Sequence, residues 1–245
     1  MSRNLVAVAL VLIAILVGAC ANPTNTSVDS PQPQSTATFT PRPSPTAPPA
    51  VAFEIQGENL YEDPVGSLRL LFEVKNINPL TVEDLTVTVI LRDADGQTVA
   101  SQSAHTRLNV LRAGESAPAM VVFFLGAPGF SIYEVDVYAG KGGYLAGLLH
   151  PGLEIVDDLG RVGEWVPYEV LGQVHNIGDS DAESVTLVVT CYDEGGRVVA
   201  IGSGAPEERT IPAGGSSQFL VSIGGVAGEI ASYKVQVQGL IVNEN

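Results

Sequence analysis

The chain repeats itself at a spacing of 100 residues, and this duplication limits the possible fold more than any other feature. Val74-Lys75-Asn76-Ile77 returns as Val174-His175-Asn176-Ile177. Aligning residues 72–138 with residues 172–238 without a gap gives 19 identities in 67 positions. One register held over so many turns indicates two copies of one domain. Each copy must therefore fold within about 95 residues.

The boundary between the copies falls in the glycine-rich segment 140–152. We therefore expect a first domain at 51–140, a linker at 141–151 and a second domain at 152–245. Two small domains in tandem, rather than one large domain, are the organisation that the repeat favours.

Each copy has the pattern of an all-β domain. In residues 85–92 the odd positions are all apolar and the even ones are mainly polar, and residues 185–192 repeat this parity. A period of two is typical of a strand with one buried face. Asp93-Ala94-Asp95-Gly96 and its counterpart Asp193-Glu194-Gly195-Gly196 then predict a tight turn, because aspartate caps its own backbone and glycine accepts positive φ.

Short strands with frequent turn signals continue through both copies. We predict seven strands in each copy and hence two tandem immunoglobulin-like antiparallel β-sandwiches of the immunoglobulin or fibronectin III type. The predicted strands are 53–57, 68–76, 85–92, 97–103, 108–111, 117–124 and 133–139, and in the second copy 153–156, 168–175, 185–192, 197–203, 209–211, 217–223 and 232–239.

The second copy resembles the FxLYD-type domain of bacterial lipoproteins and exported proteins. The resemblance rests on the following residues: Val170-Leu171-Gly172-Gln173-Val174-His175-Asn176, then Tyr192-Asp193 with Gly196, then Ile211-Pro212-Ala213-Gly214 with Phe219. It covers roughly 165–240 and, more weakly, 66–138. The first copy departs from the pattern at Phe72 and Arg92, where the second has Gly172 and Tyr192. The resemblance implies a β-sandwich in the cell envelope, and it implies no reaction.

The N-terminus has the plan of an export signal. Arg3 precedes an uncharged apolar run from Leu5 to Val17, and the small residues Gly18 and Ala19 precede Cys20. The segment resembles a bacterial lipoprotein signal, in which the signal peptide (1–19) is removed and the cysteine is acylated, for example with palmitate. Two alternatives stay open: an ordinary signal peptide cut after Ala19, and an uncleaved membrane anchor, although a spanning helix needs about 20 apolar residues.

Residues 20–50 form a lipidated cysteine followed by a disordered linker. From Ala21 to Ala50, 8 of 30 residues are proline and 10 are serine or threonine. Such a composition does not bury enough apolar surface to offset the entropy of ordering the backbone. Its prolines favour extended polyproline II, so the linker would hold a domain up to roughly 90 Å from its anchor.

The charge excludes one class of partner. The formal net charge of −15 argues against nucleic-acid binding, which needs basic patches. It also argues against adhesion to anionic lipid by charge, which leaves the acyl chains of Cys20 to hold the protein at the extracytoplasmic face of the cell membrane. An acidic surface also keeps an exported protein soluble.

Few residues suggest chemistry. Cys191 shares the inward parity of Val189, so we interpret it as a small buried hydrophobe rather than a reactive thiol or an intermolecular disulfide. If Cys20 is acylated, Cys191 has no second cysteine to pair with, so we expect a fold without an intramolecular disulfide. No motif presents a catalytic nucleophile or a phosphate loop. We predict no catalysis and no cofactor.

Metal sites are weakly indicated. The three histidines His105, His150 and His175 show no ligand spacing, so no zinc site is expected. Asp93 opens a segment like a calcium loop, but position 12 of that loop is Ala104 rather than glutamate. The acidic segments 157–158 and 179–181 remain candidates for weak calcium binding, and no metal site is predicted.

The last candidates are aromatic. Trp165, the only tryptophan, lies in sequence between Tyr144 and Tyr168 around the domain junction. These rings could stack on sugars or anchor a partner. The interpretation that we favour is that Trp165 packs between the two sandwiches or fills one core.

We therefore expect a lipid-anchored extracytoplasmic lipoprotein that presents two sandwiches for protein–protein or envelope interaction. One alternative is a carbohydrate- or ligand-binding module that uses Trp165. The other is an accessory subunit of a larger envelope enzyme or transporter.

Overall fold

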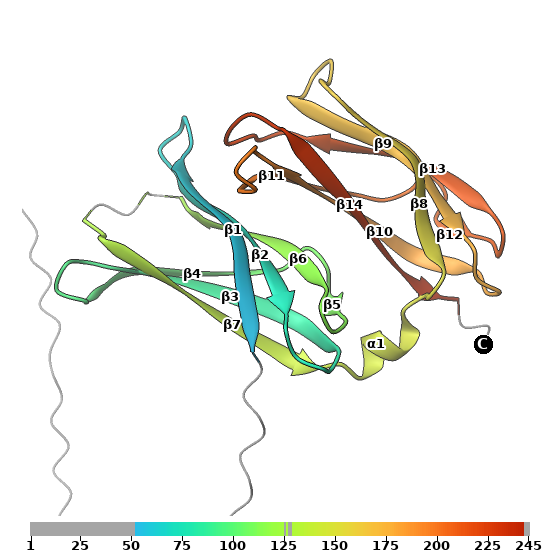
Figure 1. The fold of residues 1–245 in the computed structure, drawn as a ribbon, viewed down its shortest axis with the longest axis horizontal. Helices are drawn as coiled ribbons and strands as arrows, with labels where there is room; N and C mark the ends of the chain where they lie inside the picture. The colour runs from blue at the N-terminus through green and yellow to red at the C-terminus, as the bar shows by residue number, and fades with distance from the viewer. Residues whose placement is uncertain (1–51, 125, 127–128, 243–245) are drawn as a thin grey trace, which may run out of the picture. The chain divides into compact units, whose positions relative to one another are not determined.

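Nearly all of the regular structure is β-strand, and the strands divide evenly between the two copies of the repeat. The computed structural model describes residues 52–124, 126 and 129–242. One short helix, α1 (Tyr144–Leu148), lies between the copies (Figure 1). The strands are β1 (Phe53–Glu62), β2 (Leu68–Asn76), β3 (Val82–Arg92), β4 (Thr98–His105), β5 (Val110–Leu111), β6 (Ser116–Phe123), β7 (Ile132–Lys141), β8 (Leu153–Arg161), β9 (Tyr168–Asn176), β10 (Ala182–Tyr192), β11 (Val198–Gly204), β12 (Thr210–Ile211), β13 (Ser216–Ile223) and β14 (Ser232–Ile241).

Each copy is a sandwich of two antiparallel sheets (Figure 1). In sandwich 1 (residues 53–141), sheet A has the order β1-β2-β6, and sheet B joins β4, β5 and β7 to β3. In sandwich 2 (residues 153–241), sheet D has the order β8-β9-β13, and sheet C joins β11, β12 and β14 to β10. The prediction of two tandem seven-stranded immunoglobulin-like sandwiches is confirmed.

The two cores contain the same kind of aromatic side chain, supplied by different strands. In sandwich 1, Phe72 of β2 is fully buried and lies directly opposite Ala119 of β6. In sandwich 2 the pair is exchanged, and Phe219 of β13 lies opposite Gly172 of β9. A Cβ atom on Gly172 would come within 2.9 Å of the Phe219 ring. The exchange conserves core volume, which close-packed interiors require. It explains why the first copy has Phe72 where the second copy has Gly172.

The first strand of each sandwich is longer than the sequence predicts. The predicted strands 53–57 and 153–156 are observed as β1 and β8, which continue through a bulge for about five more residues. At these bulges Gly57 and Asp157 have φ of +63° and +54°. A bulge inserts residues without ending the ladder. The alternation of apolar and polar residues is interrupted there, so the sequence pattern predicts that the strand ends too early.

A buried asparagine closes one end of each sandwich. The Asn76 side chain is fully buried, and its Nδ2 atom donates to the carbonyls of Leu80 at 2.8 Å, Leu111 at 3.0 Å and Arg112 at 3.2 Å. Asn176 repeats this arrangement in sandwich 2, with donation to Ser180 and Ile211, 2.9 Å each. The repeated asparagine therefore ties the loop after the second strand to the segment that precedes the sixth.

Replacing either asparagine by alanine removes the donor and leaves its carbonyl partners unpaired in the interior. We expect Asn76→Ala and Asn176→Ala each to lower the free energy of unfolding by about 2 kcal/mol or more, measured by chemical denaturation. Asn109→Ala, at an exposed position, is the control and should change stability by less than about 0.5 kcal/mol. An equal effect at all three positions would contradict this role.

Candidate functional site

The outer face of sheet A is covered by sandwich 2 rather than by solvent. Leu71 points away from its own core, since its neighbours Leu70 and Phe72 belong to that core, yet it is only 2% exposed. Strand β11 contacts β1, β2 and β6. Val188 of β10 is buried within the hydrophobic cluster of sandwich 1. The outer face of sheet A therefore packs on the outer face of sheet C.

A small polar network orients these two faces. The Glu73 carboxylate accepts hydrogen bonds from Lys234 Nζ at 3.2 Å and from the Ser116 hydroxyl at 2.9 Å. Lys234 also donates to Ser116 Oγ at 3.0 Å, and Gln236 Nε2 donates to the Ser116 carbonyl at 2.8 Å. The Glu73 side chain is 10% exposed and that of Lys234 is 40% exposed. A pair in this setting fixes orientation more than it adds stability.

Tyr192 lies beside this network. Burial, and then the Glu73 carboxylate, raise the pKa of the Tyr192 phenol, which therefore stays protonated at neutral pH. The corresponding residue of sandwich 1 is Arg92, which pairs with Glu134 of its own sheet at 2.8 Å. Arg92 of sheet B therefore pairs with a residue of its own sheet, whereas Lys234 of sheet C pairs with Glu73 of the other sandwich.

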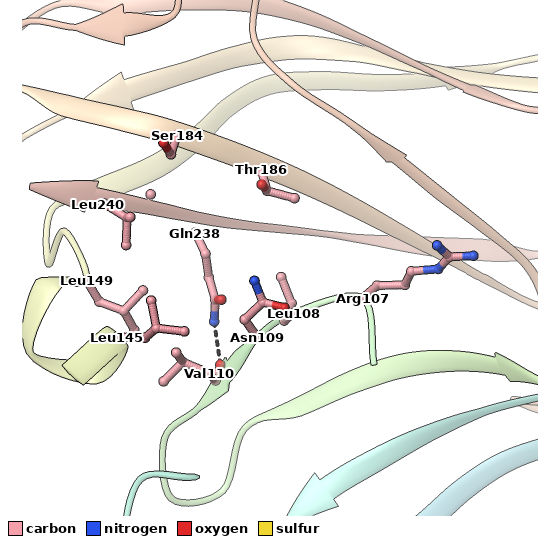
Figure 2. A pocket seen from close by; sticks show the side chains of 11 residues that line it. Arg107, Leu108, Asn109, Val110, Leu145, Leu149, Ser184, Thr186, Gln238 and Leu240 are labelled. Carbon is pink, nitrogen blue, oxygen red and sulfur yellow. Dashed lines mark hydrogen bonds between the residues drawn. The ribbon is translucent and has the colours of Figure 1, made fainter. Parts of the chain in front are cut away.

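A cavity of about 210 Å³ lies where the linker joins the two sandwiches (Figure 2). Sandwich 1 contributes the segment before and within β5, α1 and its C-terminal end contribute two leucines, and sandwich 2 contributes β10 and β14. The lining residues are Arg107, Leu108, Asn109, Val110, Leu145, Leu149, Ser184, Thr186, Gln238, Gly239 and Leu240. Gln238 Nε2 donates to the Val110 carbonyl across this cavity.

The linker that forms one wall of the cavity is held on both sides. The Glu83 carboxylate accepts a hydrogen bond from the Ala146 amide at 3.2 Å, and the N–H of Gly143, with other amides at the start of α1, lowers the pKa of this carboxyl. His150 is buried; its Nδ1 atom accepts from Gly152 N–H at 3.1 Å, so Nε2 donates to the Ser180 carbonyl at 2.8 Å. The His150 amide donates to the Gly239 carbonyl at 2.8 Å.

The cavity combines an apolar wall with neutral polar groups. Leu145 and Leu149 lie at one end and Arg107 at the other, with amides and hydroxyls between them. Its lining contains no carboxylate, histidine or cysteine, so it holds no candidate for a general base or a metal ligand. Sites for drug-sized ligands usually enclose about 300–1,000 Å³, so this cavity suits only a small amphipathic molecule.

The structure does not bring the three predicted aromatic residues together. Tyr144 begins α1 and is 78% exposed, whereas Tyr168 packs in the core of sandwich 2, edge-on to Tyr233 at a centroid distance of 6.3 Å. Trp165 lies in the β8–β9 loop, separated from the linker by the full length of β8, and is 88% exposed. The expectation that Trp165 packs between the sandwiches or fills a core is therefore wrong. Its loop extends beyond the last ladder pair, where no strand covers the ring.

Cys191 and Asp93 have the structural roles that the sequence pattern predicts. Cys191 is fully buried, and burial raises the pKa of its thiol to about 12, which confirms the interpretation as a buried hydrophobe. Asp93 Oδ1 accepts from the amides of Asp95 and Gln97 at 3.0 and 2.8 Å, which confirms the tight turn. Among the described residues, no three histidine, cysteine, aspartate or glutamate side chains are grouped to hold a metal ion.

The predicted lipidation site, Cys20, and the proline-rich linker lie outside the described residues. Within residues 52–242, apart from the three loop residues left out, no helix is long and apolar enough to cross a membrane.

The residues that join the sandwiches were missed by sequence reasoning, although a signal for them exists. They occupy outward positions at which the two copies differ in charge. Glu73, Lys234 and Gln236 correspond to Gln173, Glu134 and Asp136. Within a duplicated domain, such differences at outward positions mark the surfaces that the two copies use differently.

Comparisons with known proteins leave the family open. No family model and no curated protein matches the chain. Among solved structures, red sea bream transglutaminase is similar with a TM-score of 0.25 and 9% identity, over 78% of this chain and 32% of that chain. The chain thus spans about a third of the solved chain that it matches, and a likeness at this level carries no argument about activity.

Reversing the charge of Lys234 should weaken the contact between the sandwiches. In Lys234→Glu a carboxylate faces Glu73, so we expect faster proteolytic cleavage in the linker 142–152, measured by limited proteolysis, and partial recovery when Glu73→Lys is added. Asp136→Lys, at an exposed position on sheet B, is the control and should leave the cleavage rate unchanged. Equal cleavage of both single variants would contradict the role of the pair.

The buried thiol predicts a loss of stability in alkali. The Cys191 pKa is raised from 9.0 to about 12, so above pH 9 the unfolded chain ionises this thiol while the folded chain does not. Unfolding then releases a proton, and stability falls as pH rises from about 9 to 12, by on the order of 1 kcal/mol per pH unit. Cys191→Val should lose less stability than the parent between pH 8 and 10.5, measured by denaturant unfolding. Parallel curves would refute the assignment.

Proposed function

We propose that this protein is a lipid-anchored, extracytoplasmic lipoprotein of the FxLYD type whose two sandwiches act as a non-catalytic module for binding another protein. The observation that carries this proposal is the exposure of Trp165. A tryptophan that is 88% exposed beside Val162, itself 81% exposed, is costly to leave in water and is typical of binding hot spots.

Sandwich 1 has a similar apolar end. Val65 and Phe124 are 84% and 77% exposed in the β1–β2 and β6–β7 loops. These two loops are neighbours, since a Cβ atom on Gly126 would lie 3.3 Å from the Gly66 carbonyl. Loops carried on a rigid sandwich commonly provide recognition surfaces.

Affinity capture from the cell envelope tests the binding role. The full chain should recover a partner protein, and Trp165→Ala should reduce its recovery at least tenfold. Tyr144→Ala removes an aromatic ring of similar exposure on α1 and should leave recovery unchanged. Equal recovery with Trp165→Ala would refute the role of this loop.

The carbohydrate alternative uses the same tryptophan and is tested separately. Trp165 is the only tryptophan, so intrinsic fluorescence reports directly on its environment. Cell-wall oligosaccharides should leave the emission unchanged. A saturable change abolished in Trp165→Ala would favour sugar binding over protein binding.

The anchor is tested at Cys20. In Cys20→Ala the acceptor for acylation is lost, so incorporation of labelled palmitate should cease and the chain should leave the membrane fraction while it remains folded by circular dichroism. Retention of Cys20→Ala in the membrane would favour an uncleaved apolar helix instead.

A further inference from the structure

The outer face of sheet D carries a row of three leucines. Leu159 of β8 and Leu220 of β13 both lie directly opposite Leu171 of β9. Leu159 is 58% exposed and Leu220 is 51% exposed, while Leu171 is half-buried. Large apolar side chains on adjacent strands form a continuous patch, and such a patch on a protein surface commonly marks an interaction site.

Carboxylates flank this row at both edges of the sheet. Asp157 forms the bulge of β8, directly before the leucine of that strand. Glu207 lies beside β13, because its amide donates to the Gln218 carbonyl at 2.8 Å. Both carboxylates are exposed, and both line a hollow of about 310 Å³ to which two of the leucines also contribute. The surface therefore combines an apolar floor with an acidic rim.

The charge of this rim is not neutralised within the described residues. The lining of the hollow has one cation, Arg161, which already pairs with Glu169 at 3.0 Å. Asp157 and Glu207 make no ion pair with a described residue. Two such carboxylates beside an apolar floor repel an acidic partner and attract a cationic one.

The second copy has both properties where the first copy lacks them. Leu159 stands where sandwich 1 has Asn59. Glu207 stands where sandwich 1 has Arg107, and Asp157 stands where it has a glycine. Sheet D is therefore more apolar along the row and more acidic at its edges than the corresponding face of sheet A.

The same face of the other copy is a docking face, and it shows what such a face accepts. Sheet C covers sheet A with an apolar residue and a cation. Val188 is buried in the hydrophobic cluster of sandwich 1, and Lys234 Nζ lies 3.2 Å from the Glu73 carboxylate. Leu71, the counterpart of Leu171, is thereby only 2% exposed. The occupant of sheet A is thus an apolar surface that carries a positive charge.

We propose that the outer face of sheet D binds a basic amphipathic peptide segment of another protein. Its apolar side chains pack on the leucine row, and its lysine or arginine side chains pair with Asp157 and Glu207. The leucine row determines the apolar side of the segment, and the acidic rim determines its charge. This inference goes beyond the proposed function, because sheet D carries it rather than the loop of Trp165.

The area of the face favours a peptide over a folded domain. Three strands of about nine residues cover roughly 400 Å², about half of the ~800 Å² that each partner buries in a standard interface between folded proteins. The same area argues against a pair of copies of this chain. The acidic rims of two copies would also repel each other.

The experiment titrates the full chain, in mild detergent, into a fluorescently labelled peptide and follows the anisotropy of the label. The peptide has about twelve residues of leucine, lysine and serine, with its leucines on one side. We expect a Kd of about 1–100 µM. Replacing the lysines of the peptide by glutamate, or its leucines by serine, should raise the Kd at least tenfold.

Variants of the full chain test the face itself. Leu220→Gln removes part of the apolar row, and Glu207→Arg introduces the residue type of sandwich 1, so each should raise the Kd at least tenfold. Glu207→Arg should also make binding less sensitive to salt. The matched controls lie on sheet B at exposed positions: Tyr138→Gln and Asp136→Arg should each change the Kd by less than twofold.

The proposal fails if the lysine and glutamate peptides bind equally, or if Leu220→Gln and Glu207→Arg leave the Kd unchanged. Pairing of copies in light scattering that Leu220→Gln abolishes would assign the face to a second copy instead. A peptide affinity that rises at least tenfold in Arg42→Glu would assign it to the proline-rich segment of the chain. Circular dichroism of each variant separates a loss of binding from a loss of fold. None of these results depends on Trp165, so this proposal and the proposed function fail or stand separately.

Discussion

The contact between the outer faces of sheets A and C is the interaction on which the rest of this structure depends. It turns two sandwiches joined by a short linker into one compact unit. Apolar burial provides its driving force, since Leu71 and Val188 are excluded from water. The Glu73–Lys234 pair and the Gln236 amide then favour the observed orientation, because a buried carboxylate that lost its partner would be costly.

A heterologous contact joins two different faces of one fold. Because sheet A of sandwich 1 packs on sheet C of sandwich 2, their counterparts in the other copy, sheets D and B, take no part in this contact. Here the free faces have diverged in opposite directions. Sheet B has gained the carboxylates Glu134 and Asp136, with Arg92 paired internally, and so resembles an ordinary solvated surface. Sheet D carries the leucines Leu159, Leu171 and Leu220 beside the Arg161–Glu169 ion pair. Within the described residues, the contact of sheet A with sheet C therefore leaves the outer faces of sheets B and D uncovered by the other sandwich.

Much of this fold was predictable because backbone rules act locally. The period of two, the Asp-x-x-Gly turns and the inward parity of Cys191 each depend on a few adjacent residues, and the strands they predict lie within a few residues of those observed. The bulges at Gly57 and Asp157 were missed because a bulge interrupts the periodicity that identifies a strand. The exposure of Trp165 was missed for another reason: an aromatic residue is usually buried, and only the tertiary structure shows that its loop extends past the sheets. The docking faces were missed because Leu71 and Leu171 are identical in type and differ only in what covers them, so only the charge differences at Glu73 and Lys234 distinguish the copies there.

The entry of the chain into each sandwich bears on the proposed role. β1 begins at Phe53, opposite Asn76, and β8 begins at Leu153, opposite Asn176, so each sandwich receives the chain at the end that its buried asparagine closes. The exposed residues Val65 and Trp165 follow β1 and β8, and therefore lie at the opposite ends of their sandwiches. In each sandwich the exposed apolar loop therefore lies at the end opposite to the one at which the first strand begins.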